Sequence, residues 1–401
     1  MGDYCIYGFY EKAGVSGVIK MRLAIVNLTG GGLSGGYKKY LKNMLPRLAD
    51  HKYVDTLLCV SPEGDDIPSW FKEPSIANYC KCNPLTLRQL IKIPDRKMKE
   101  CLKKFAPDIL FLPVDRHIKF NNVPVVNMVR NMEPFIPNMK GDTLHEVFKK
   151  FVQRRLVINA IRQADHTIAV SRFVEDYLKS KLNVSKEKVS LVYHGLSSQI
   201  NGNCVRPASV PVEWDSKFLF TCGSVRPARG LEDLFEAMSY LKASNLDINV
   251  VIAGNTIPGM RKYHNGLKRL IELKGLNHNV RWVGNLEDDE MCWCYNRCHL
   301  FVMTSRIEAC PNIALEAMSH GCVIISTDSL PMPEFFREAA VYYSHGKGNS
   351  LSAAIQRMLK SDNYRKKISE CGKKRASEFS WDRCVEKTVT ELVKIAERFK
   401  T

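Results

Sequence analysis

Short apolar runs alternate with amphipathic segments along almost the whole chain, and this alternation restricts the possible folds more than any other feature. Each run is continuously apolar, so it predicts a strand that is buried on both faces. The segments between the runs have apolar residues at helical spacing. Strands that alternate with helices form parallel sheets covered on both faces, so the sequence predicts a doubly wound α/β fold. The expected strands are 22–27, 56–60, 107–112, 123–129, 166–170 and 189–193, and then 218–222, 248–253, 280–283, 299–303, 322–326 and 339–343.

The alternation stops once, between residues 195 and 214, and then begins again. This interruption is rich in Gly, Ser, Asn and Pro and has no periodicity, which is typical of a linker. A chain of 401 residues is also too long for one ordinary hydrophobic core. The sequence therefore predicts two domains. Their expected limits are 1–200 for the first, with an irregular leader at 1–20, then a linker at 201–214 and a second domain at 215–380.

A polar loop in the second half carries two glutamates, Glu308 and Glu316, between two expected strands. Pro311 stands where the helix of residues 312–320 should begin, since its missing N–H costs nothing in a first turn. Gly321 is the expected end of that helix. A loop that leads into a helix N-terminus binds anions, because unpaired N–H groups and the helix dipole point at the ligand. The pattern therefore predicts an anion site flanked by two carboxylates.

A second loop follows the first expected strand of the second half and carries Arg226 and Arg229 just before a helix. Guanidinium groups stay charged and match phosphate oxygens, so two of them at a helix start can bind a diphosphate. The alternative is a solvated basic turn. The anion site of the neighbouring loop favours phosphate binding.

The first half has a glycine-rich loop, residues 30–36, directly after its first strand. Gly30 to Gly35 match the dinucleotide pattern G-x-G-x-x-G, but no acidic residue ends the next strand, where only the displaced Glu63 is present. The loop is not a P-loop, because Tyr37 stands where a lysine is needed. It predicts either a tight turn or a close approach of the backbone to a phosphate.

The charge and the cysteines restrict the partners and the compartment. The formal net charge is +17 and the pI about 9.2, which favours polyanionic partners unless most of the charge is simply solvated. Nucleic acid is the less favoured polyanion, since no basic motif is interleaved with aromatic residues. The 14 cysteines show neither a disulfide framework nor zinc-type spacing, so we expect reduced thiols, no metal and a cytoplasmic location. No apolar run is long enough to span a bilayer, and the first 20 residues lack the apolar core of a signal peptide.

A basic helix expected at about residues 143–163 offers a separate surface. Its basic and apolar side chains are interleaved, and basic amphipathic helices can lie on anionic lipid. The alternative is a helix that packs on the sheet with its basic face in water. Peripheral association with the cytoplasmic face of a membrane is therefore one expectation. The residues concerned are Lys149, Lys150, Arg154 and Arg155, with Phe148, Phe151, Val152 and Leu156 between them.

Together these motifs resemble those of retaining glycosyltransferases with two Rossmann-like domains (GT-B) in family 4. The family's E-x7-E motif matches Glu308 to Glu316, followed by Ala317-Met318-x-x-Gly321. The family's loop of glycine and basic residues corresponds to residues 223–230. The resemblance covers nearly the whole chain after residue 21 and implies a GT-B fold. Three further segments are similar: Asp165 to Ser171, Val192 to Gly195, and Phe379-Ser-Trp381, which begins a last helix, 381–401, expected to pack back on the first domain.

The resemblance implies a nucleotide-sugar donor in the second domain, with no cofactor and no metal. Glu308 and Arg229 would be the catalytic residues, Glu308 at the sugar hydroxyls and Arg229 at the diphosphate. Glu316 would hold the ribose. Further donor contacts would come from Cys310, Pro311, Asn312 and Ile313 at the helix N-terminus, from Ser224 and Arg226, and from Gly35 or Gly36 of the first domain.

Two positions depart from the family pattern. The family's arginine directly after the first glycine of its loop is Ser224 here, so Arg226 is the expected substitute. The family's His-Asp pair after the fourth strand is Arg130-Asn131 here. The sugar or acceptor contact of that histidine would then pass to Arg130 or Asn131, or to His117 on the preceding loop.

The sequence thus predicts transfer of a hexose or related sugar from a UDP- or GDP-sugar to a hydroxyl of a glycan or lipid-linked acceptor, with retained configuration. Two other functions stay open. One is a dinucleotide-dependent oxidoreductase that uses the loop from Gly30 to Gly35, and the other is a non-catalytic basic nucleic-acid binder. Glu334 resembles a recurrent family glutamate and is expected to be structural.

Overall fold

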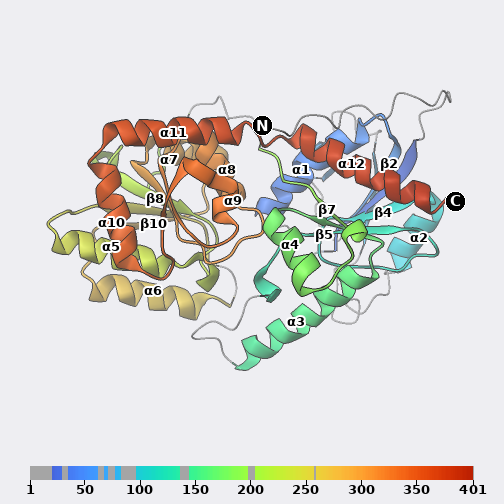
Figure 1. The fold of residues 1–401 in the computed structure, drawn as a ribbon, viewed down its shortest axis with the longest axis horizontal. Helices are drawn as coiled ribbons and strands as arrows, with labels where there is room; N and C mark the ends of the chain where they lie inside the picture. The colour runs from blue at the N-terminus through green and yellow to red at the C-terminus, as the bar shows by residue number, and fades with distance from the viewer. Residues whose placement is uncertain are drawn as a thin grey trace.

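The computed structural model describes residues 20–28, 35–61, 67–70, 77–82, 96–135, 144–196, 204–256 and 259–400. These residues form two domains, each a parallel sheet covered by helices (Figure 1). The prediction of two doubly wound α/β domains is confirmed. The leader at 1–19, residues 30–34 of the glycine-rich loop, and Glu63 lie outside the described residues.

The first domain has a seven-stranded parallel sheet in the order β3-β2-β1-β4-β5-β6-β7. Its central strand β1 (Met21–Val26) pairs with β2 on one side and with β4 on the other, so that Ile25 lies between Cys59 and Phe111. The other strands are β2 (Val54–Ser61), β3 (Ala77–Lys81), β4 (Ile109–Leu112), β5 (Val125–Val129), β6 (His166–Ala169) and β7 (Val189–Leu191). The helices in the described part of this domain are α1 (Gly35–Ala49), α2 (Arg96–Phe105), α3 (Leu144–Gln163) and α4 (Arg172–Lys181), with 3-10 turns such as η4 (Glu133–Phe135).

The second domain has a six-stranded parallel sheet in the order β10-β9-β8-β11-β12-β13. Successive side chains of a strand point to opposite faces, so Phe301 packs in one apolar layer and Val302 in the other. The strands are β8 (Phe218–Cys222), β9 (Asn249–Ala253), β10 (Val280–Gly284), β11 (Leu300–Met303), β12 (Ile324–Thr327) and β13 (Ala340–Tyr343). The helices are α5 (Leu231–Ala243), α6 (Arg261–Leu273), α7 (Asp288–Arg297), α8 (Asn312–Ser319), α9 (Met332–Phe336), α10 (Gly348–Leu359) and α11 (Asp362–Ala376).

The chain leaves the first domain after Gly195 and returns to it at Ser380, and these two segments touch. Leu196 and Ser380 form a bridge between them. Position 195 admits only glycine, because a Cβ there would lie 2.1 Å from the backbone nitrogen of Trp381. Beyond this crossing, α12 (Trp381–Arg398) runs across α1, and its apolar face belongs to the core of the first domain (Figure 1).

Two features differ from what the sequence led us to expect. The structure contains the disulfides Cys80–Cys101 and Cys204–Cys292, so the expectation of reduced cysteines throughout is wrong. The partners are 21 and 88 residues apart and meet only through the fold, so spacing along the chain does not reveal them. The apolar pattern also misses β3, because this edge strand has exposed Asn78 and Lys81 and no continuous apolar run.

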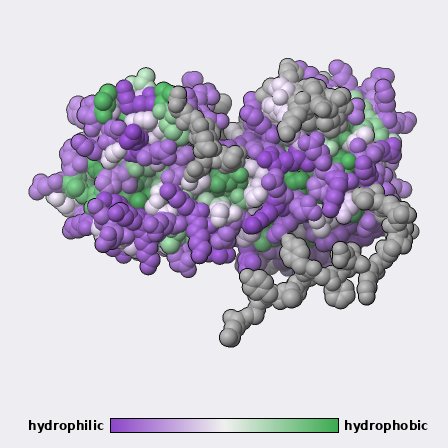
Figure 2. All heavy atoms as spheres, turned by 90° about the horizontal axis from the view of Figure 1, so that it is seen from above, coloured by the Kyte–Doolittle hydropathy of each residue, from purple (hydrophilic) through white to green (hydrophobic). Residues whose placement is uncertain are grey.

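The surface seen from above, which carries α11 and α12, is mainly hydrophilic, with hydrophobic positions scattered over both lobes (Figure 2). Within the described part of the chain, no helix is long and apolar enough to cross a membrane.

Candidate active site

In each sheet the strand order reverses at one place, between β1 and β4 in the first domain and between β8 and β11 in the second. Ligands of doubly wound sheets bind beyond the carboxyl ends of the strands at such places. In the second domain, the loops that leave this place are 223–230 and 304–311. They are the two loops that carry Arg229 and Glu308, so the topology brings together the motifs that the sequence singled out.

Two hydrogen bonds to backbone carbonyls of the first loop join these two loops. Arg306 N donates to the Ala228 carbonyl over 2.8 Å, and the Thr304 hydroxyl donates to the Arg229 carbonyl over 2.6 Å. The first loop ends as a 3-10 turn, η7 (Pro227–Arg229), which is closed by Gly230 in the left-handed conformation. The backbone of Arg229 is therefore fixed in place before its side chain makes any contact.

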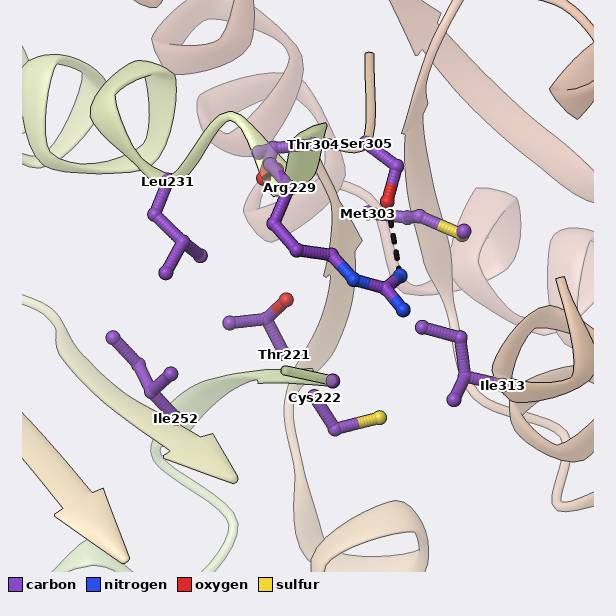
Figure 3. Close-up of a pocket in the computed structure, with 10 residues that line it drawn as sticks. Thr221, Cys222, Arg229, Leu231, Ile252, Met303, Thr304, Ser305 and Ile313 are labelled. Atoms are coloured by element: carbon purple, nitrogen blue, oxygen red, sulfur yellow. Dashed lines mark hydrogen bonds between the residues drawn. The ribbon is translucent and has the colours of Figure 1, made fainter. Parts of the chain in front are cut away.

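Arg229 is the central side chain of the candidate site. Its Nη1 donates to Glu308 Oε1 over 2.5 Å and to the Ser305 hydroxyl over 3.1 Å. The two charged side chains are 15% and 12% exposed, so water screens this ion pair only weakly. A Cβ at Gly223 would lie 2.7 Å from Arg229 Cζ, so the guanidinium needs a glycine beside it. Figure 3 shows the guanidinium directed between Ser305 and Ile313.

Helix α8 begins beside these residues and meets α1 of the first domain. Pro311 is its N-cap, and the helix itself begins at Asn312. A Cβ at Gly36, in the first turn of α1, would lie 3.5 Å from Asn312 Nδ2. The N-termini of two helices therefore lie together at the domain junction. Both dipoles favour an anion there, as the sequence pattern predicts for the α8 end.

Glu316, the second glutamate of the motif, is held by both domains. Its Oε1 accepts a hydrogen bond of 2.6 Å from Lys39 Nζ of α1. Its Oε2 accepts one of 3.1 Å from the Tyr295 hydroxyl of α7. Burial raises the pKa of Tyr295, so this hydroxyl remains a donor at neutral pH. The carboxylate lies at the same junction as the two helix N-termini.

Arg226 also pairs across the domain junction. Its Nη1 lies 2.7 Å from Glu133 Oε1, which belongs to η4 of the first domain. Ser224 is half-buried on the same loop, next to Val225, which forms a bridge with Thr256. That Arg226 replaces the family arginine absent at Ser224 stays a prediction.

Arg130 lies at the carboxyl end of β5, on the first-domain side of the junction. Its guanidinium stacks on the Tyr37 ring, with 3.6 Å between Cζ and the ring centroid. Burial raises the pKa of Asp115, and the neighbouring Arg116 and Arg130 partly oppose that rise. A cation, an aromatic ring and a carboxyl group are thus gathered at the ends of β4 and β5.

The other two residues expected near the sugar or acceptor have different surroundings. Asn131 is exposed, and its Oδ1 accepts a hydrogen bond of 3.0 Å from the Glu133 backbone N–H, so it stabilises the start of η4. His117 lies on the half-buried loop that follows β4. A role for either residue in binding stays a prediction.

The thiols and the imidazole nearest these loops are uncharged at neutral pH. Burial raises the pKa of Cys222 to about 12 and also raises that of Cys310. Burial lowers the pKa of His194 to about 4, although its Nδ1 pairs with Asn312 Oδ1 over 3.2 Å. These three groups therefore supply neither a thiolate nor an imidazolium for chemistry near pH 7.

The structure adds three residues that the sequence motifs did not single out, Lys39, Glu133 and Tyr295, and it gives His194 of the motif segment 192–195 a partner in Asn312. Each meets its partner only through the fold, and Lys39 and Glu316 are 277 residues apart. One sequence signal was present for Lys39. It lies three residues after Gly36, so helical spacing places both on one face of α1.

Solved structures share this architecture over nearly the whole chain. HepE of Anabaena, in complex with UDP-glucose, aligns with a TM-score of 0.70 and 15% identity over 93% of this chain and 100% of that chain. A glycosyltransferase of Rickettsia africae ESF-5 aligns with a TM-score of 0.67 and 18% identity over 93% and 98%. Sucrose-phosphate synthase of Thermosynechococcus elongatus aligns with a TM-score of 0.70 and 15% identity over 93% and 99%. The fold class is GT-B.

Family comparisons cover both halves of the chain. Residues 34–199 match the family described as Glycosyltransferase Family 4, and residues 207–375 match the family described as Glycosyl transferases group 1. Neither match alone covers half of the chain, but together they span both domains and place the chain with these glycosyltransferase families. This assignment favours a glycosyltransferase over the dinucleotide-dependent oxidoreductase and the nucleic-acid binder.

Individual relatives are distant. Two uncharacterized glycosyltransferases of Methanocaldococcus jannaschii are 23% and 26% identical over 56% and 57% of this chain. Those matches cover 58% and 60% of the relatives, less than two thirds of their length. The O-antigen chain mannosyltransferase RfbU of Salmonella typhimurium is 20% identical over 83% of this chain and 90% of its own length.

Proposed function

We propose that this protein transfers a hexose or related sugar from a UDP- or GDP-sugar to a hydroxyl of a glycan or lipid-linked acceptor, with retained configuration and without a metal. One observation carries the proposal. Glu308 and Glu316 flank the N-terminus of α8, and Arg229 donates a hydrogen bond to Glu308 beside that N-terminus. Carboxylates can accept hydrogen bonds from the hydroxyls of a sugar and a ribose. A guanidinium shielded from water and a helix N-terminus can bind a diphosphate.

The donor would lie mainly on the second domain. Its diphosphate would meet Arg229 and the N-termini of α8 and α1, where Gly36 leaves room for a close approach. Glu308 would accept hydrogen bonds from the sugar hydroxyls, and Glu316 from the ribose. Both carboxylates are now paired with cations of the protein itself. Donor binding would therefore exchange ion pairs within the protein for contacts with the ligand.

In the transfer step, the bond between the sugar's anomeric carbon and the diphosphate oxygen breaks, and a bond from that carbon to the acceptor oxygen forms on the same face. The acceptor's proton passes to the leaving diphosphate. Negative charge grows on that diphosphate, and Arg229 and the helix N-termini would stabilise it. The thiols of Cys222 and Cys310 are protonated at neutral pH, which argues against a cysteine nucleophile.

The relatives support these substrate classes. HepE has been crystallised with UDP and with UDP-glucose, which supports a nucleotide-sugar donor. RfbU is an O-antigen chain mannosyltransferase, which supports a glycan acceptor. A thermal-shift comparison of UDP, GDP and ADP would identify the nucleobase of the donor, because a ligand that binds only the native state raises the melting temperature of the protein.

Transfer from radiolabelled UDP- and GDP-sugars tests the assignment. We expect Glu308→Gln to lose about 100-fold or more in kcat, since a neutral amide cannot fully replace the carboxylate at the sugar. Glu338→Gln makes the same chemical change at an exposed position of the same domain and should keep full activity. Equal activity of wild type and Glu308→Gln would show that Glu308 is not catalytic. No transfer from any nucleotide sugar by the wild type would contradict the proposed function.

A further inference from the structure

Helix α3 carries an apolar face that no part of the described chain covers. Phe148, Phe151 and Val152 are 66%, 51% and 38% exposed. They lie at positions i, i+3 and i+4, so they form one stripe on the helix. Arg155 continues the stripe at i+7, with its guanidinium 4.6 Å from the centroid of the Phe151 ring. We propose that this stripe is a docking surface for an anionic lipid bilayer.

The two ends of the helix have different surroundings. Val157 and Ile161, in the C-terminal half, are buried in the core of the first domain. The exposed phenylalanines all lie in the N-terminal half. Figure 1 shows α3 extending below the first domain, on the edge of the molecule opposite to α11 and α12. The helix is therefore anchored at one end and presents its apolar stripe at the other.

The charge around the stripe fits an anionic surface. Residues 20–200 hold 30 Lys and Arg against 17 Asp and Glu, so +13 of the formal net charge of +17 falls on the first domain. Within α3, five basic residues stand against one acidic residue, and Arg154, Arg155 and Arg162 are exposed. Anionic lipids attract such basic clusters, while apolar side chains enter the boundary between head groups and acyl chains.

A second copy of the chain fits this surface less well. A symmetric dimer places the same patch against itself. The exposed Arg154 and Arg155 would then face their own copies, and like charges at an interface are unfavourable. A nucleic acid would satisfy the arginines but would leave Phe148 and Val152 without an apolar environment. A bilayer satisfies both the charges and the apolar stripe.

The position of α3 also connects the surface with the candidate active site. Helix α3 lies against η4, and Glu133 of η4 pairs with Arg226 of the motif loop over 2.7 Å. A bilayer bound at α3 would thus lie next to the domain junction. This step rests on the proposed function: it favours an acceptor that is itself anchored in lipid, with its hydroxyl presented at the membrane surface.

Vesicle flotation with the full chain tests the docking surface and needs neither donor nor acceptor. We compare vesicles of phosphatidylcholine alone with vesicles that also contain phosphatidylglycerol. Two double variants, Phe148→Ser with Phe151→Ser and Arg154→Glu with Arg155→Glu, remove the apolar and the charged part separately. Phe399→Ser, at a site 51% exposed just past the end of α12, and Lys366→Glu with Lys367→Glu at exposed positions of α11 are the matched controls.

We expect the wild type to float with phosphatidylglycerol vesicles only, and each α3 double variant to bind about tenfold less. The controls should bind as the wild type does. The proposal is overturned if the wild type does not float with anionic vesicles, or if the controls lose as much binding as the α3 variants. It is also overturned if the α3 variants float normally but lose a concentration-dependent dimer or binding to a single-stranded polynucleotide. A failure of sugar transfer leaves the flotation result unchanged, so the two proposals are tested separately.

Discussion

Lys39 and Glu316 form an ion pair of 2.6 Å that joins α1 of the first domain to α8 of the second. The Glu316 carboxylate also accepts a hydrogen bond from the Tyr295 hydroxyl, so each of its two oxygens accepts one hydrogen bond from the protein. Arg229 and Glu308 form a second pair at the same site. The two glutamates of the motif are therefore neutralised by cations that a bound nucleotide sugar would have to displace or share.

Lys39 should oppose donor binding if Glu316 holds the ribose. Removing the ammonium in Lys39→Met frees the carboxylate, and partly exposed pairs of this kind contribute about 0.2–1 kcal/mol, so we expect a dissociation constant roughly 1.5- to 5-fold lower. Calorimetry with UDP and GDP measures this dissociation constant. Lys42→Met, at an exposed position of the same helix, is the control and should change nothing. Weaker binding in Lys39→Met would instead show that Lys39 contacts the donor directly.

Arg229→Ala should lower kcat by about 100- to 1000-fold, because it removes a preorganised cation at the leaving diphosphate. Steady-state kinetics with the preferred donor measures the loss, and Arg297→Ala, at an exposed arginine of α7, serves as the control. Residues that act as a unit are not additive, so Arg229→Ala combined with Glu308→Gln should lose little more than either change alone. Fully additive losses would mean that the ion pair is not a functional unit.

The fold can be predicted from the sequence because strands of a parallel sheet that are buried on both faces consist of consecutive apolar residues. The strand β11, for example, has no polar side chain between Leu300 and Met303. The same logic misses β3, where Asn78 and Lys81 face water at the sheet edge. It also misses both disulfides, since their partners are 21 and 88 residues apart and are brought together only by the fold.

The candidate site follows from the sequence only where its parts lie close together along the chain. Glu308 and Glu316 are recognisable because the loop and helix pattern between them fixes their spacing of eight residues. The contacts that cross the domain junction, such as Glu133 with Arg226 and Lys39 with Glu316, depend on the relative placement of two sheets. No local pattern encodes that placement, so the partners of the motif residues appear only in three dimensions.

Acid should destabilise the protein through His194. Burial lowers its folded-state pKa to about 4, whereas an unfolded histidine titrates near 6.5, so the unfolded state binds the extra proton more readily. The stability of the folded state is therefore complete above pH 6.5 and is lost as the pH falls toward 4. Between pH 7.5 and pH 5 we expect the wild type to lose about 2 kcal/mol more unfolding free energy than His194→Gln, which does not titrate.

Urea unfolding at the two pH values measures this difference. The other histidines whose pKa burial lowers, such as His166 and His299, are common to both proteins, so their contribution cancels in the comparison. Equal pH dependence in wild type and variant would show that His194 is protonated in the folded protein and that its contact with Asn312 does not depend on a neutral ring.

Glu334 of α9 caps a helix of the other domain, which accounts for its structural role. Its carboxylate accepts hydrogen bonds from the backbone N–H groups of Arg172 (2.7 Å) and Phe173 (3.0 Å) at the start of α4, and from the Tyr193 hydroxyl (2.6 Å). In Glu334→Gln one oxygen becomes an amide NH2 that faces another donor, and the favourable charge at the helix N-terminus is lost. We expect a loss of about 1–2 kcal/mol in unfolding free energy, measured by urea titration, whereas Glu338→Gln on the exposed side should change it by less than about 0.5 kcal/mol. Equal stability of the two variants would mean that the cap contributes nothing to holding the domains together.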